Sequence, residues 1–128
     1  MPSRQTLDAF ITLVERGHFV EAIENFYASD ATMQENQDPP RGGRDVLIAG
    51  ERQVMSMFPT IETRKVERAL VDGDFVVINW VFSFTTSSGQ TMMLDELALQ
   101  RWSGDRIVYE QFYYDPAQRR FAEETGSR

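Results

Sequence analysis

The stretch GHFVEAIENFYASDATMQE, residues 17–35, passes from a helical pattern into a strand and ends on a carboxylate. Five apolar residues recur in it at the spacing of one helix face: Phe19, Ala22, Ile23, Phe26 and Tyr27. A short strand then runs into the proline-containing loop 36–43 at Glu35. Glu35 is therefore either a solvated loop residue or the acid/base group of a pocket.

Two further helices flank this stretch. The first is predicted over residues 7–14 and ends at Gly17, because Leu7, Phe10, Ile11 and Val14 follow the i, i+3, i+4, i+7 pattern. The other is predicted over residues 45–58 and stops at Pro59. Its apolar positions are Leu47, Ile48, Val54, Met55 and Phe58.

The second half changes to a strand pattern. Segments rich in β-branched and aromatic residues are separated by the turn sequences DGD, SSG and SGD, which predicts four long strands over 61–71, 75–86, 90–102 and 106–115. We expect one α+β domain, residues 1–128, with three N-terminal helices packed on a strongly curved antiparallel sheet and a flexible tail over about 120–128.

The sheet is expected to bury both of its faces. Apolar residues of both parities occur in FVVINWVFSF, residues 75–84, so neither face has the polar character of a solvated surface. This favours a homodimer formed through the sheet. The alternative is a sheet that tolerates exposed apolar side chains.

Composition excludes several classes of function. The 128 residues are 41% hydrophobic and 26% charged, with a net charge of −7 and scattered basic residues, which argues against a nucleic-acid binder. There is no cysteine for thiolate or metal chemistry, and the single histidine, His18, lacks a ligand pattern, so no metal site or cofactor is expected. Neither a signal peptide nor an apolar run of membrane-spanning length is recognisable, which predicts a cytoplasmic protein.

The order of these segments resembles the NTF2-like superfamily, in particular the SnoaL-like polyketide cyclases and ketosteroid isomerases. The pieces that carry the resemblance are GHFVEAIENFYASDATMQE, RGGRDVL, VDGDFVVINWVF and LQRWSGDRIVYEQFYYD, which together span about residues 5–116. The resemblance implies a cone-shaped (cystatin-like) roll with a deep cavity that binds a small apolar organic molecule without a cofactor.

The isomerase branch implies a role for Glu35. In those enzymes a carboxylate at this position shuttles a proton, and burial in an apolar pocket raises the pKa of such a group. Phe10 and Ala98 stand where the isomerases carry their two hydrogen-bond donors to the substrate oxygen. Neither side chain can donate, which argues against steroid isomerase chemistry itself.

Strand alternation suggests another set of polar groups for the cavity. If Ala98 faces inward, so do Leu94, Glu96 and Gln100, and the same matching turns Glu110, Phe112 and Tyr114 inward. Like charges in a dry cavity do not all ionise, so one carboxyl is expected to stay protonated. The alternative makes Glu96 and Glu110 outward carboxylates paired with Arg101 or Arg106.

The cyclase branch points to the end of the last strand. Asp115 stands at the position of the cyclases' acid/base aspartate, and Glu110 stands about where those enzymes carry a histidine. A competing interpretation is that Asp115, which precedes Pro116, belongs to a turn.

Taken together, the sequence predicts a protein that binds a small apolar organic molecule and that, if it is an enzyme, performs isomerase-like or cyclase-like proton transfer next to a carbonyl. The alternative is a non-catalytic ligand-binding or dimeric interaction module. The candidate catalytic residues are Glu35, Glu96, Glu110, Tyr114 and Asp115. The candidate ligand-binding residues are Phe10, Val14, Phe26, Met55, Phe58, Trp80, Phe82, Ala98, Gln100, Trp102 and Phe112.

Overall fold

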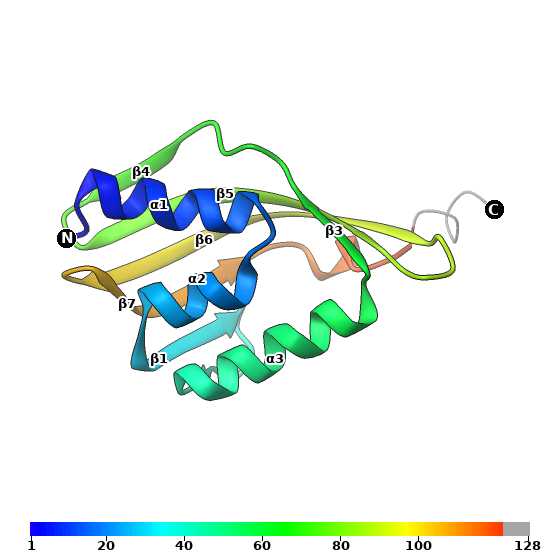
Figure 1. The fold of residues 1–128 in the computed structure, drawn as a ribbon, viewed down its shortest axis with the longest axis horizontal. Coiled ribbons are helices and arrows are strands. Elements are labelled where there is room, and N and C mark those ends of the chain that lie inside the picture. The colour runs from blue at the N-terminus through cyan, green and yellow to red at the C-terminus, as the bar shows by residue number, and fades with distance from the viewer. Residues whose placement is uncertain (122–128) are drawn as a thin grey trace.

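The computed structural model describes residues 1–121 and consists of three helices on one face of a curved sheet (Figure 1). The helices are α1 (Arg4–Glu15), α2 (Phe19–Phe26) and α3 (Arg44–Met57), and the short 3-10 helix η1 (Pro116–Gln118) follows the last strand. The strands are β1 (Tyr27–Glu35), β2 (Arg41–Gly42), β3 (Thr60–Thr63), β4 (Ala69–Asp72), β5 (Phe75–Thr85), β6 (Thr91–Ser103) and β7 (Arg106–Tyr113).

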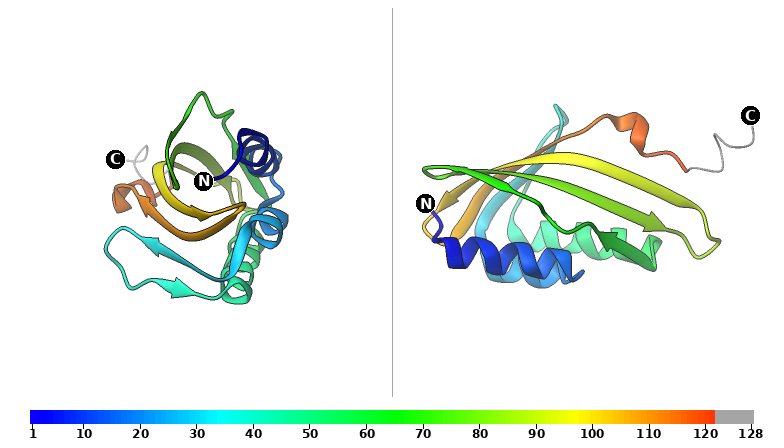
Figure 2. Two further views of the ribbon diagram at one scale, coloured as in Figure 1. Left: turned by 90° about the vertical axis from the view of Figure 1, so that its left-hand side faces the viewer. Right: turned by 90° about the horizontal axis from the view of Figure 1, so that it is seen from above.

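The predicted α+β class is confirmed, with one correction to the sheet. Its strand order is β2-β1-β7-β6-β5-β3, and β4 also pairs with β5. All pairs are antiparallel except β1 and β7, which run parallel, so the sheet is mixed rather than antiparallel. Figure 2 shows the sheet curving around the helices without closing on itself.

The strand predicted over residues 61–71 is two short strands. β3 pairs with the far end of β5, through Thr63 and Phe82, whereas β4 pairs with its near end, through Ala69 and Ile78. The chain between them leaves the sheet, and the backbone N–H of Val66 donates to the carboxylate of Glu15 on α1 at 2.7 Å. The single long strand was therefore a wrong prediction.

The core lies between the helices and the concave face of the sheet. Every second residue of β6 from Met92 to Trp102 is buried, and the residues between them are exposed except the half-buried Leu99, as the period of two requires. Phe10 of α1 is central: its ring contacts those of Phe26, Trp80 and Trp102 at centroid distances of 5.6, 6.2 and 5.9 Å. All three contacts are edge-on, an arrangement that aromatic pairs favour.

The predicted flexible tail, residues 120–128, falls mostly on residues 122–128, which lie outside the described part of the chain. Within residues 1–121, no helix combines the length and apolar character needed to cross a membrane.

Candidate active site

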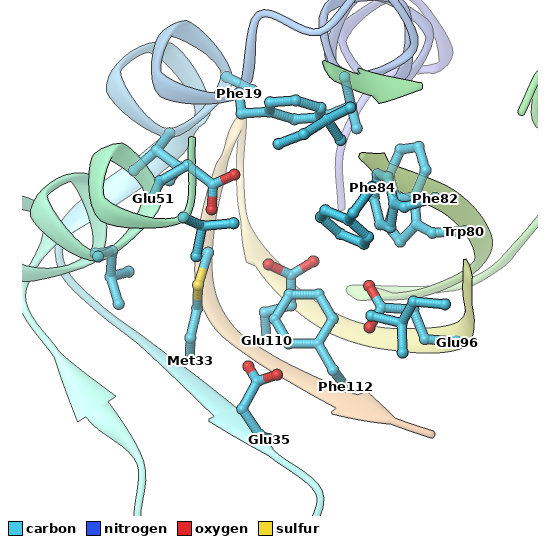
Figure 3. A pocket seen from close by; sticks show the side chains of 18 of the residues that line it. Phe19, Met33, Glu35, Glu51, Trp80, Phe82, Phe84, Glu96, Glu110 and Phe112 are labelled. Atoms are coloured by element: carbon cyan, nitrogen blue, oxygen red, sulfur yellow. The ribbon is translucent and has the colours of Figure 1, made fainter. Parts of the chain in front are cut away.

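A cavity of about 340 Å³ lies between the helices and the concave face of the sheet (Figure 3). Its walls are largely aromatic and aliphatic, as is usual for sites that bind small organic molecules. Four carboxyl groups, those of Glu35, Glu51, Glu96 and Glu110, also face it. The aromatic lining consists of Phe10, Phe19, Tyr27, Phe58, Trp80, Phe82, Phe84, Phe112 and Tyr114.

Glu35 ends β1 with its side chain on the cavity wall. One carboxylate oxygen accepts a hydrogen bond from the hydroxyl of Tyr114 at 3.0 Å, and the other lies 3.3 Å from the guanidinium of Arg41. Both contacts stabilise negative charge on the carboxylate. Tyr114 in turn accepts a hydrogen bond from Arg119 at 3.3 Å.

The turn after Glu35 holds β1 against β7. Asn36 adopts a left-handed conformation with φ of 48°, which asparagine tolerates better than most residues. Its backbone N–H donates to the carbonyl of Phe112 at 2.7 Å, and its side-chain oxygen accepts from the backbone N–H of Tyr114 at 3.0 Å. These bonds bring Glu35 and Tyr114 to the same edge of the cavity.

Glu110 on β7 is fully buried, and each of its carboxyl oxygens accepts a hydrogen bond. The hydroxyl of Tyr27 donates to one oxygen, and the amide of Gln100 donates to the other at 2.7 Å. Burial raises the pKa of Glu110 to about 7. The two hydrogen bonds oppose that rise, and the nearby carboxylates of Glu35 and Glu51 add to it.

Glu96 on β6 is 5% exposed, and its carboxyl group has no hydrogen-bond partner within residues 1–121. Its side chain points into the cavity (Figure 3). Burial raises its pKa to about 9, and the carboxylates of Glu35, Glu110 and Glu51 contribute to the same rise. Glu96 is therefore protonated at neutral pH and offers an O–H donor to whatever occupies the cavity.

Glu51 on α3 is a cavity residue that the sequence analysis missed. Burial raises its pKa; the guanidinium of Arg41 opposes the rise, and the carboxylate of Glu35 adds to it. A signal was present, because Leu47, Glu51, Val54 and Phe58 follow the i, i+4, i+7, i+11 spacing of one helix face. A charged residue within an apolar stripe indicates a carboxyl group on the inward side of the helix. Arg41 and Met33 also line the cavity and were not predicted.

The structure divides the residues predicted for the site into three groups. Glu35, Glu96, Glu110 and Tyr114 line the cavity, as do Phe10, Val14, Phe58, Trp80, Phe82 and Phe112. Phe26, Met55, Ala98, Gln100 and Trp102 do not. The side chain of Asp115 caps η1 by accepting from the backbone N–H of Ala117 at 2.9 Å, which confirms the turn interpretation.

Two physical reasons explain the residues that fall outside the lining. Val54 on α3 and Phe58, the residue that follows the helix, line the cavity, whereas helical rotation leaves Met55 37% exposed at the surface. On β6, the ring of Phe10 packs against Trp102, and the lining residues of this strand are Met92, Leu94 and Glu96, so the cavity follows the half of the strand that ends at Glu96. The alternative that paired Glu96 and Glu110 with Arg101 or Arg106 at the surface is wrong, because both carboxyls are buried.

Within residues 1–121, no group of three or more histidine, aspartate or glutamate side chains is arranged to hold a metal ion.

The family model described as the SnoaL-like domain matches residues 7–110, and the chain therefore belongs to this family. No curated protein matches the chain.

Several solved structures share the fold. A Mesorhizobium loti protein, provisionally designated a SnoaL-like polyketide cyclase, is 23% identical with a TM-score of 0.72, over 86% of this chain and 97% of that one. A Catenulispora acidiphila protein with a ketosteroid isomerase-like fold, in complex with trimethylamine, is 19% identical with a TM-score of 0.74, over 91% and 89% of the two chains. TerC, co-crystallised with polyporic acid, is 13% identical with a TM-score of 0.73, over 88% and 91%. At these identities the likenesses establish the fold.

Proposed function

We propose that the protein binds a small, largely apolar carbonyl compound in the cavity and catalyses a cofactor-independent proton transfer next to the carbonyl. The observation that carries the proposal is the presence of two unlike carboxyl groups in one cavity. The carboxyl group of Glu35 accepts a hydrogen bond from Tyr114 and lies 3.3 Å from the guanidinium of Arg41. Glu96 is buried, its carboxyl group has no hydrogen-bond partner among the described residues, and its raised pKa keeps it protonated at neutral pH.

Each of the two groups suits one half of such a reaction. Glu35 accepts the proton when the C–H bond next to the carbonyl breaks, and the bonding electrons move to the carbonyl oxygen. Glu96 donates a hydrogen bond to that oxygen as negative charge develops on it, so the site does not need donors at Phe10 and Ala98. Return of the proton from Glu35 to another carbon gives an isomerase. Attack of the enolate carbon on a second carbonyl, with the proton on Glu35 passing to the new alkoxide oxygen, gives a cyclase.

Most of the other polar groups of the cavity already have partners, and the rise in the pKa of Glu51 is opposed by the guanidinium of Arg41. The hydroxyls of Tyr27 and Tyr114 donate to Glu110 and Glu35, and both oxygens of Glu110 accept hydrogen bonds. Glu96 is therefore the first choice for the donor. Asp115 has no part in the proposal, because its carboxylate caps η1.

The reaction class has a test that does not require the natural substrate. The protein is incubated in D2O with a series of cyclic ketones of graded size, and deuterium incorporation next to the carbonyl is followed by mass spectrometry. We expect faster incorporation for ketones that bind. Glu35→Gln should lose about 10² to 10⁴ of that acceleration, whereas Glu24→Gln on the exposed face of α2 should keep it.

The second candidate function is ligand binding without turnover. It is favoured by Phe10 and Ala98, which leave the site without the two donors of the steroid isomerases. Quenching of Trp80, which lines the cavity, reports binding independently of exchange. A ketone that quenches Trp80 but exchanges no faster than in buffer refutes the catalytic proposal and supports the binding function.

A homodimer through the convex face of the sheet is part of the proposal. The exposed apolar residues of this face include Leu70, Phe75, Leu97 and Tyr113, which are 62, 46, 48 and 39% exposed. Leu97 of β6 pairs directly with Tyr113 of β7, so these two side chains are neighbours. Apolar patches of this kind mark interfaces. We expect wild-type protein to sediment as a dimer and Leu97→Lys to sediment as a folded monomer. A wild-type monomer at high concentration would refute the dimer.

A further inference from the structure

A chain of buried hydrogen bonds lies behind the cavity wall and ends at Glu110. The indole N–H of Trp102 donates to the side-chain oxygen of Gln100 at 3.0 Å. The amide nitrogen of Gln100 donates to Glu110 at 2.7 Å, and the hydroxyl of Tyr27 donates to the other oxygen of Glu110. All four side chains are 3% exposed or less.

The indole of Trp102 determines which of its two orientations the side-chain amide of Gln100 adopts. An indole N–H only donates, so the group that faces Trp102 has to be the oxygen of Gln100, and the NH2 group has to face Glu110. A reversed amide would place its carbonyl oxygen against the carboxyl group of Glu110. The reversed amide would also place N–H against N–H at Trp102, with both donors buried and unpaired.

We propose that Trp102 and Gln100 are positioning residues: the indole of Trp102 fixes the amide of Gln100, and the amide holds Glu110 as the hydrogen-bonded carboxylate of the cavity. This deepens the proposed function and rests on it for its catalytic meaning. The sequence analysis placed both residues in contact with ligand; the structure places them behind the wall, where they act through Glu110.

Glu110 in turn influences the proposed donor. The titratable groups that face it are Tyr27 and Glu35 from β1, Glu96 from β6 and Glu51 from α3, and the cation Arg41 lines the same cavity. A negative charge on Glu110 raises the pKa of Glu96. By stabilising that charge, the hydrogen bonds from Gln100 and Tyr27 favour the state in which Glu96 keeps its proton.

The test follows the carboxyl carbon of Glu110 by NMR during a pH titration of the ligand-free protein. Gln100→Met removes the donor and should raise the proton affinity of Glu110 about tenfold or more, since hydrogen bonds to charged groups are the strong ones. Trp102→Phe should raise it less. In the Gln100→Met background Trp102→Phe should add nothing, because its effect passes through the amide. Ile78→Val changes a buried residue of β5 that takes no part in these hydrogen bonds, and it should leave the titration of Glu110 unchanged.

Two results would overturn the proposal. One is that Trp102→Phe changes the proton affinity of Glu110 equally in the wild-type and in the Gln100→Met background, which would mean that the indole acts by packing alone. The other is no effect of either variant on Glu110.

A wild-type measurement covers the case in which a variant does not fold. The indole N–H signal of Trp102 should shift with pH at the midpoint of Glu110, which lies near 7. If the indole N–H signal of Trp102 does not shift while Glu110 titrates, the proposal is also overturned. Neither measurement involves turnover, so a failure here is distinct from a failure of the ketone exchange experiment.

Discussion

Replacing Glu96 with glutamine should stabilise the protein at neutral pH. The folded protein retains the proton of Glu96 up to about pH 9, whereas the unfolded chain loses it near 4.5. The contribution of this group to stability is therefore complete below pH 4.5 and is lost progressively as the pH rises towards 9. Each pH unit in this window costs about 1.4 kcal/mol, which amounts to roughly 3 kcal/mol at pH 7.

Glutamine avoids this cost because it is neutral in both states and nearly isosteric. The carboxyl of Glu96 makes no hydrogen bond within residues 1–121, so the substitution sacrifices none there. Urea unfolding of both proteins at pH 4, 5.5, 7 and 8.5 should give equal stabilities at pH 4. The advantage of Glu96→Gln should then widen to about 3 kcal/mol at pH 7 and further at pH 8.5. A difference that does not change with pH would refute the reasoning.

Two substitutions test the framework of the cavity. Phe10→Ala should lower the free energy of unfolding, measured with urea, by about 3 to 5 kcal/mol. The reason is that the ring is 2% exposed and contacts Phe26, Trp80 and Trp102. A loss below about 1 kcal/mol would contradict the packing. Gly17→Ala should cost about 1 to 2 kcal/mol in the same assay, because Gly17 has φ of 81° and an added Cβ meets no atom within 4 Å. Backbone strain is then the whole effect, and an unchanged stability would show that the turn relaxes.

The elements that the sequence predicted correctly have strong local periods. The apolar spacing of α1, α2 and α3 and the alternation along β6 both record a single buried face. The errors concern partners distant in the sequence. β3 and β4 separate because they pair with different ends of β5, and β1 lies parallel to β7. Nothing within residues 61–71 encodes the position of β5.

In the candidate site too, local patterns were predicted correctly and contacts between distant segments were not. Alternation was sufficient to turn Glu96 and Glu110 inward, since a shift of one residue would have exposed the whole apolar face of β6. The extent of the cavity along β6 was beyond prediction, because it depends on how Phe10 of α1 packs against Trp102. The role of Gln100 required knowing that an indole lies on one side of its amide and a carboxyl on the other.

The central claim is that one cavity holds a carboxylate base and a protonated carboxylic acid. NMR titration of the Glu96 carboxyl carbon in the wild-type protein tests it most directly, with Glu96→Gln identifying the signal. The account predicts a carboxylic acid signal at pH 7 and a midpoint near 9. A midpoint near 4.5, the ordinary value for glutamate, would mean that Glu96 is ionised at neutral pH, and the cavity would then lack the proposed donor.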